Sequence, residues 1–150
     1  MVTDLTKIER SVLIQAPRAR VWRAIANVGE FAAWFQVKTE GEFTPNGRVR
    51  MTSTYPGYEG ISFVVEVLEV APESLLSWRW HPGADDPPAG EPMTLVEFHL
   101  AEEDGGTRVT VVESGFDRID VVRRAKVFDE NTQGWELQLV SLRRYAEDAH

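Results

Sequence analysis

The sequence predicts an α+β domain in which a curved seven-stranded antiparallel sheet packs against one long C-terminal helix. Three observations support this. Apolar or small residues recur every three or four positions over residues 118–147, residues 37–114 alternate with a period close to two, and turn residues interrupt that alternation at short intervals. The helix would be roughly 45 Å long. Because it is apolar on one side only, it needs a broad apolar surface, and the sheet supplies one.

The chain begins with a strand at residues 8–14, in which Arg10 shares a face with three aliphatic residues. Ala16-Pro17 ends this strand, and Pro17 suits the first turn of a helix. A short amphipathic helix follows and ends near Asn27. A second short helix is predicted over residues 29–34, with aromatic side chains on its buried side.

Six strands then follow as a meander, because Pro, Asn and Gly clusters separate them by short intervals. A longer break at residues 82–92 contains four prolines and two glycines, which predicts a surface loop. The strands are predicted at residues 37–43, 48–54, 61–70, 75–81, 94–101 and 108–113.

The long helix carries its apolar stripe through eight positions separated by alternating steps of four and three. Residues 131–134 are poor helix formers, and Gly134 is expected to allow close approach of the sheet or a ligand, or tight packing around Trp135. The stripe consists of Val121, Ala125, Phe128, Thr132, Trp135, Leu139, Leu142 and Ala146.

Composition excludes several classes of function. At 150 residues with 43% hydrophobic content, one domain spanning residues 1–150 is expected. The net charge of −8 argues against nucleic acid and against insertion into anionic membranes. The sequence has no cysteine, and its histidines and acids lack metal-ligand spacing, so we expect neither a metal nor a cofactor. No signal peptide or membrane span is apparent, which favours a cytoplasmic protein.

Several short motifs, taken in order, resemble the helix-grip superfamily of START and Bet v 1-like domains (SRPBCC). Within it, the chain is most similar to the family named for the activator of Hsp90 ATPase. The resemblance implies a hydrophobic ligand between sheet and long helix, and some members of the superfamily are aromatases, cyclases or hydrolases. The motifs are Ala16-Pro17 with Val21-Trp22, Trp34-Phe35, residues 76–80 with their tryptophans, Gly106-Thr107-Arg108, residues 113–116 and Gly134-Trp135.

Strand parity and helix periodicity together predict the wall of such a ligand site. The sheet would contribute Trp78, Trp80, Phe98 and Val111, and the helix Phe128, Thr132 and Trp135. Wide, rigid tryptophans can hold two layers apart and so line an apolar pocket. The alternative for each of these residues is an ordinary packed core.

Arg10 and Glu113 are the two charges predicted on the inner face. In the fold that the chain resembles, the first and last strands are neighbours, so we expect the two side chains to meet. They would then form a polar anchor for a ligand, an acid–base group or a buried structural ion pair, unless a β-bulge turns one of them outward.

Three functions are compatible with these features. The first is binding of a small hydrophobic or aromatic molecule between the sheet and the helix. The second is a cyclase, dehydratase or hydrolase that uses the same cavity, although the sequence contains no recognised catalytic motif. The third is a chaperone-associated interaction domain. Homodimerisation is left open by the sequence.

Overall fold

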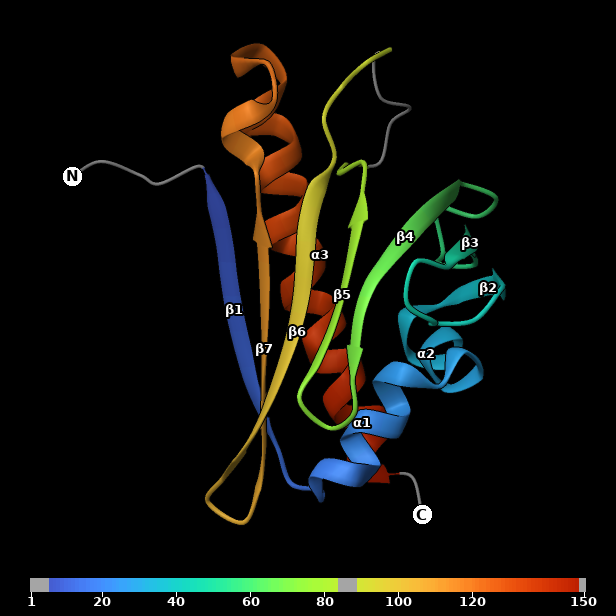
Figure 1. Cartoon of the computed structure of the whole chain (residues 1–150), viewed down its shortest axis with the longest axis vertical. Coiled ribbons are helices and arrows are strands. Elements are labelled where there is room, and N and C mark those ends of the chain that lie inside the picture. The colour runs from blue at the N-terminus through green and yellow to red at the C-terminus, as the bar shows by residue number, and fades with distance from the viewer. Residues whose placement is uncertain (1–5, 84–88, 149–150) are drawn as a thin grey trace, which may run out of the picture.

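The computed structural model describes residues 6–83 and 89–148, and its elements follow the predicted order (Figure 1). Residues 84–88 of the predicted surface loop lie outside the described residues. The elements are β1 (Lys7–Ile14), α1 (Arg18–Ala26), α2 (Val28–Phe35), β2 (Val37–Glu40), β3 (Arg48–Ser53), β4 (Ser62–Ala71), β5 (Leu75–Trp80), β6 (Thr94–Glu103), β7 (Gly106–Ser114), η1 (Phe116–Arg118) and α3 (Val121–Asp148).

The seven strands form one antiparallel sheet in the order β1-β7-β6-β5-β4-β3-β2. Strands β2 to β7 make the predicted meander, and the first strand pairs with the last one, from Lys7 opposite Ser114 to Ile14 opposite Thr107. The predicted β2 is too long by three residues. Gly41 (φ 112°) ends the regular strand, and a Cβ at this position would lie 2.5 Å from the carbonyl oxygen of Arg48.

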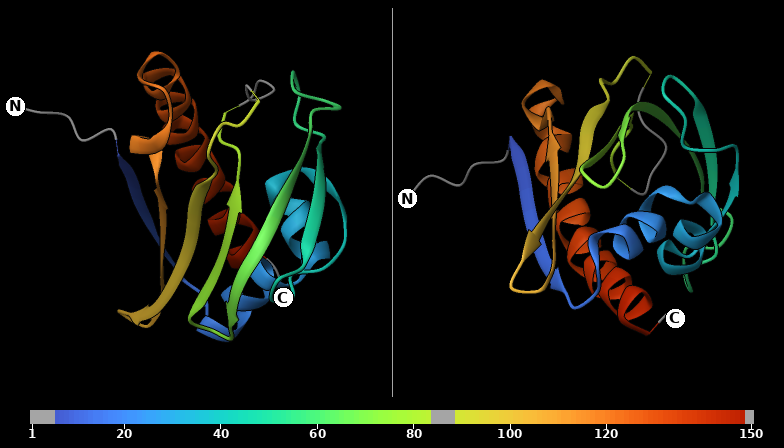
Figure 2. Two further views of the ribbon diagram at one scale, coloured as in Figure 1. Left: turned by 45° about the horizontal axis from the view of Figure 1, so that its top comes forward. Right: turned by 60° about the horizontal axis from the view of Figure 1, so that its bottom comes forward.

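Helix α3 crosses the inner side of the sheet diagonally (Figure 2), which confirms the α+β helix-grip fold. Its C-terminal half carries the predicted stripe, but the N-terminal part of the prediction is wrong. Val121 is 71% exposed and Ala125 is also exposed, whereas Val127, off the predicted stripe, is buried. The buried positions are Val127, Trp135, Leu139, Leu142 and Ala146.

The predicted close approach of the sheet at Gly134 is also wrong. A Cβ added at this glycine would have no side chain or strand within 4 Å. Close contact between α3 and the sheet comes instead from neighbouring residues, because Trp135 is 3% exposed. Gly134 therefore only weakens the helix locally.

The two short helices close one end of the structure, which we call the lower end because it lies at the bottom of Figure 1. Asn27 accepts a hydrogen bond from the backbone N–H of Glu30 (3.0 Å) and so caps α2. Trp34 Nε1 donates to the carbonyl of Ala24 (2.8 Å), and Ser141 Oγ donates to the carbonyl of Trp34 (2.6 Å). These bonds tie α1, α2 and α3 together.

The opposite, upper end has no helix across its mouth. Strand β5 ends there at Trp80, β6 begins there at Thr94, β7 ends there at Ser114, and α3 begins nearby (Figure 1). Residues 82–83 and 89–93 of the β5–β6 connection lie at this end. Among the described residues, loop rather than helix therefore lies over the upper end.

Candidate ligand site

Three of the predicted ligand residues belong to the closed centre of the core. Trp78, Phe98 and Val111 are all fully buried. Trp78 packs against the rings of Phe31, at a centroid distance of 5.7 Å, and Phe98, at 5.2 Å. Interdigitated aromatic rings fill this part of the space between the sheet and the helices.

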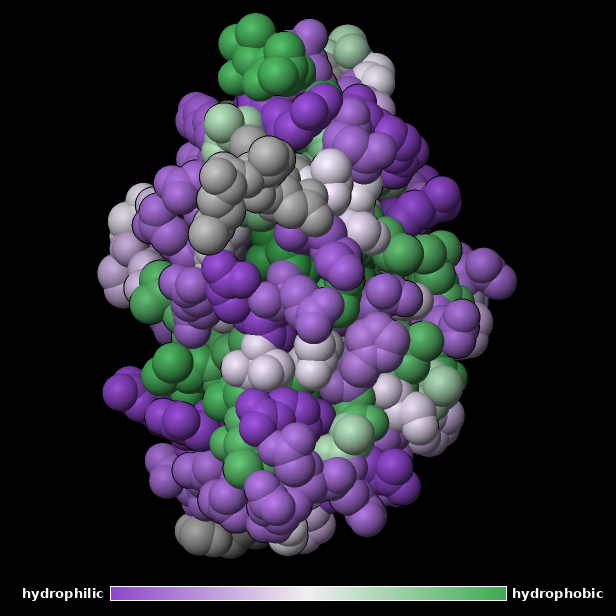
Figure 3. Space-filling view, turned by 90° about the vertical axis from the view of Figure 1, so that its left-hand side faces the viewer, coloured by the Kyte–Doolittle hydropathy of each residue, from purple (hydrophilic) through white to green (hydrophobic). Residues whose placement is uncertain are grey.

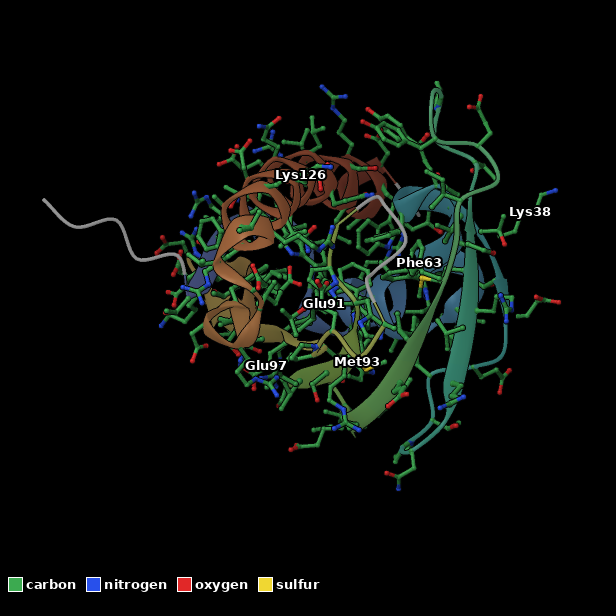
Figure 4. All side chains as sticks on the ribbon, turned by 90° about the horizontal axis from the view of Figure 1, so that it is seen from above. Lys38, Phe63, Glu91, Met93, Glu97 and Lys126 are labelled. Atoms are coloured by element: carbon green, nitrogen blue, oxygen red, sulfur yellow. The ribbon has the colours of Figure 1, made fainter. Side chains whose placement is uncertain are left out.

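Packing changes toward the upper end, where several inner-facing side chains are only half-buried. They are Phe63 of β4, Trp80 of β5, and Phe128 and Thr132 of α3. The ring of Phe63 meets Trp80 edge-on at 5.5 Å, and Trp80 stacks on Trp135 at 5.7 Å with an interplanar angle of 28°. Seen from above, Phe63 lies on the side of β4 that faces α3 (Figure 4). The rings of Phe63, Trp80 and Trp135 form an aromatic wall at the mouth. Phe128 packs against Phe116 at 5.2 Å.

A buried carboxyl group stands beside this wall. Glu113 of β7 is 0% exposed and accepts hydrogen bonds from four side chains that come from β5, β6 and α3. Its Oε1 accepts from Trp135 Nε1 (2.8 Å) and Asn131 Nδ2 (2.8 Å). Its Oε2 accepts from Trp80 Nε1 (2.8 Å), Thr94 Oγ1 (2.5 Å) and Asn131 Nδ2 (3.0 Å). A carboxylate has about four acceptor positions, so the protein fills them all.

The electrostatic environment of Glu113 is unusual because every one of these donors is neutral. Burial raises the pKa of Glu113 above its ordinary value, since the charged form is desolvated. The hydrogen bonds from Thr94, Trp80, Trp135 and Asn131 oppose this and favour the charged form, but burial prevails. Among the ion pairs of the described residues, none includes Glu113.

The expected meeting of Arg10 with Glu113 is wrong. Arg10 lies on edge strand β1, where Ile8, not Arg10, is opposite Glu113. The guanidinium extends past the edge of the sheet and its Nε donates to Glu136 Oε2 of α3 (3.0 Å). The Arg10 side chain is 43% exposed, because an edge strand offers a long cation a route to water.

Two partners of Glu113, Thr94 and Asn131, were missed by the sequence reasoning. Thr94 shares strand parity with Val96 and Phe98, so it was identifiable as an inner-face residue. Asn131 lies one turn before Trp135 and one turn after Val127, both buried. A helical stripe drawn through Val127 would have included Asn131 as a polar residue among buried ones.

Asn131 also connects the carboxyl group to the loop that covers the upper end. Its Oδ1 accepts a hydrogen bond from the backbone N–H of Gly83 (3.1 Å). A Cβ at Gly83 would lie 2.9 Å from Val127 Cγ1, so this position of the loop packs closely on α3. Farther along the loop, Glu91 forms an ion pair with Arg123 (2.7 Å). The loop is thereby attached to α3 on both sides of residues 84–88.

A separate hollow lies outside the grip, between α2 and α3. It is an open groove of about 420 Å³, lined by Ala33, Trp34, Ser141, Arg144, Tyr145 and Asp148. None of the predicted ligand residues lines it. Within the described part of the chain, no three His, Asp or Glu side chains are placed to bind a metal ion. In the same part, no helix combines the length and the apolarity needed to span a membrane.

Comparison with known proteins places these features in context. The family model for activator of Hsp90 ATPase homolog 1-like proteins matches residues 15–147. A search of curated protein sequences gave no match. Residues 15–147 include every described element except β1, which ends at Ile14, and the last residue of α3.

Solved structures share the fold at low sequence identity. A protein from Mesorhizobium loti superposes with a TM-score of 0.78 at 21% identity, covering 96% of this chain and 98% of its own. The Aha1 dimer from Colwellia psychrerythraea gives 0.74 at 17%, covering 99% and 98%. A protein from the dynemicin biosynthetic locus gives 0.72 at 24%, covering 97% of this chain and 48% of its own. At these identities, the similarity establishes the fold.

Proposed function

The chain belongs to the family of activator of Hsp90 ATPase homolog 1-like proteins, and we propose that it binds a small hydrophobic or aromatic molecule between the sheet and α3. The ligand enters at the upper end and contacts the aromatic wall of Phe63, Trp80 and Trp135. Phe128 and Thr132 of α3 complete the contact surface. Trp78, Phe98 and Val111 support this wall from the closed core.

The observation that carries the proposal is the incomplete burial of inner-facing aromatic side chains at the upper end, beside the buried carboxyl group of Glu113. Burying one such side chain fully contributes about 1.5–3 kcal/mol. Phe63, Trp80 and Phe128 lack part of that stabilisation, although all three pack against the core. A ligand that covers them would recover it, and apolar walls with a few polar groups are typical of small-molecule sites.

Binding of a neutral fluorescent hydrophobe, N-phenyl-1-naphthylamine, tests the proposal. Trp80→Ala should weaken binding about tenfold or more, because it removes the central ring of the wall. Trp22→Ala is the matched control, since Trp22 is a half-buried tryptophan of α1 at the lower end; its effect should stay below about twofold. Equal effects of the two variants would contradict the proposed site. Native mass spectrometry of the purified protein would reveal a co-purified molecule directly.

An enzymatic role for the same site is the second candidate, favoured by the raised pKa of a buried carboxyl group. Of the four partners, only the Thr94 hydroxyl can both donate and accept, because Asn131 Oδ1 is engaged by Gly83. A protonated Glu113 would therefore hold its proton on Oε2, toward Thr94. Turnover of any substrate should then be lost in Glu113→Gln, at a temperature where circular dichroism shows a folded protein.

Association with other proteins is a further proposal. The family description names Hsp90, and one structural neighbour is a dimer. Leu137 and Val140 on the outer side of α3 are 60% and 38% exposed, and could contribute to a homodimer. Light scattering of the wild type and of Leu137→Glu would test it: a dimer that the substitution dissociates is expected, and a monomeric wild type would refute it.

A further inference from the structure

Among the described residues, no basic side chain forms an ion pair with Glu113. Its partners are two indole N–H groups, a hydroxyl and a primary amide, all neutral. Buried carboxylates are ordinarily paired with a cation or bound to a metal ion, because an isolated charge is costly in a medium of low dielectric constant. The four dipoles stabilise the ionised form of Glu113 locally, but they supply no positive charge to offset it.

Neighbouring basic side chains have other partners. Arg123 pairs with Glu91 (2.7 Å), and Arg118 donates to the carbonyl of Met93 (2.7 Å). Arg124 donates to the backbone carbonyls of Asp117 (2.9 Å) and Ile119 (3.0 Å). The sequence therefore places several cations near the start of α3 without directing these ones to the buried carboxylate.

The aromatic wall has the complementary property. The ring of Trp80 donates its N–H to Glu113 in the ring plane, so its π face is not used by that bond. One face stacks on Trp135, and the rings of Phe63 and Trp78 each lie at 5.5 Å with interplanar angles of 77° and 61°. An indole that donates to a carboxylate is more electron-rich, which strengthens attraction of a cation to its face.

We propose that the ligand of the upper end is a hydrophobic cation, whose positively charged group lies against the Trp80 and Phe63 rings beside Glu113. This rests on the proposed function and specifies its ligand class. Because four donors already occupy the acceptor positions of the carboxylate, the ligand is recognised by charge through space rather than by a hydrogen bond. A fully substituted ammonium group, which donates none, fits this requirement.

The proposal is tested with two probes of the same shape. Benzyltrimethylammonium and neopentylbenzene differ only in the replacement of the cationic nitrogen by carbon. Titrations followed by tryptophan fluorescence should show the cation binding the wild-type protein about tenfold or more tightly than the neutral probe, once desolvated cation–π and charge attraction act together. This comparison needs no variant, so it holds even if substitutions at Glu113 impair folding.

Glu113→Gln then tests whether the preference for the cationic probe comes from Glu113. It should reduce affinity for the cation about tenfold, while affinity for neopentylbenzene changes less than about threefold. Glu97→Gln is the matched control, because it removes one negative charge on the outer side of neighbouring strand β6 (Figure 4). It should leave the preference intact.

The outcomes separate the two levels of the proposal. If neopentylbenzene binds the wild type as tightly as the cation, the site binds hydrophobic molecules but the cationic ligand class is refuted. A preference that survives in Glu113→Gln or disappears in Glu97→Gln would attribute it to the overall charge of the protein, and would also refute the inference. Absence of binding by both probes would overturn the inference and the proposed function together.

Discussion

The two ends of the space between the sheet and α3 are built on different principles. At the lower end, α1 and α2 cover the mouth, and side chains such as Val21, Ile25 and Phe31 are fully buried. At the upper end, a loop covers the mouth, aromatic side chains are half-buried, and a polar network surrounds Glu113. The same helix and the same sheet thus hold an apolar core at one end and a polar site at the other.

This difference indicates that the lower end contributes more to the stability of the fold than the upper end does. An apolar end gains free energy from every buried side chain. At a polar end, the hydrogen bonds only offset the free-energy cost of burying polar groups. Loss of one hydrogen-bond partner there lowers the free energy of unfolding substantially. Val121 and Val122 at the start of α3 are 71% and 85% exposed, and an apolar patch lies at the top of the molecule (Figure 3).

The largest expected effect is at the lower end. Phe31→Ala should lower the free energy of unfolding by about 3–5 kcal/mol, because Phe31 is fully buried and packs against four other aromatic rings, those of Trp34, Phe35, Phe43 and Trp78. Denaturant titration measures it. Phe63→Ala at the upper end should cost less, since its ring is half-buried. Equal costs would mean that the two ends do not differ in packing.

Removal of Asn131 tests the polar end. Asn131→Ala should cost about 1–3 kcal/mol, because it takes a donor from buried Glu113 and an acceptor from the N–H of Gly83. Exposed Gln133 on the same helix is the control, and Gln133→Ala should change stability by less than about 0.5 kcal/mol. Similar small effects for both would show that the network contributes little.

The pH dependence of stability should also report on the polar end. Because the pKa of Glu113 is raised on folding, the folded state binds its proton more tightly than the unfolded chain does. Its contribution is fully present below the unfolded pKa, near 4.5, and is lost as pH rises through the folded pKa. The free energy of unfolding of the wild type minus that of Glu113→Gln should therefore fall as pH rises from about 4 to 8. A difference that rises over this range would reverse the assigned direction.

Gly134 lies on α3 between the two ends and belongs to neither. Gly134→Ala should stabilise the protein by about 0.5–1 kcal/mol, because it lowers the backbone entropy of the unfolded chain and a methyl group meets open space. A higher midpoint of thermal unfolding is the expected result. Destabilisation would indicate that the sheet or a ligand does approach this glycine.

The smallest effect is expected at the edge of the sheet. Arg10→Ala removes a half-exposed ion pair with Glu136 and should cost less than about 1 kcal/mol. A loss of 3–5 kcal/mol, typical of breaking a buried pair, would mean that Arg10 does serve Glu113 after all. Chemical denaturation at moderate salt distinguishes these cases.

Much of the fold was predictable because its signals are local. Alternation fixed the inner faces of β6 and β7, including Glu113, and the turns at Pro45-Asn46-Gly47 and Asp104-Gly105-Gly106 separated the strands. The start of α3 was not predictable in the same way. Val121 continues the apolar spacing, but the first turn of α3 extends past the edge of the sheet, so Val121 is exposed. The local sequence contains no signal for where the sheet ends.

By itself, the sequence determined that an antiparallel sheet would grip one long helix and that a carboxyl group would stand on the inner face. Only the tertiary structure decided the partners of that carboxyl group. Hydrogen-bond partners depend on how strands and helix align in space, so Asn131, Thr94 and two indoles converge on Glu113 while Arg10 leaves at the sheet edge toward Glu136. Strand parity predicts which face of the sheet a side chain points to. The strand register and the position of α3 decide which residues it contacts on that face.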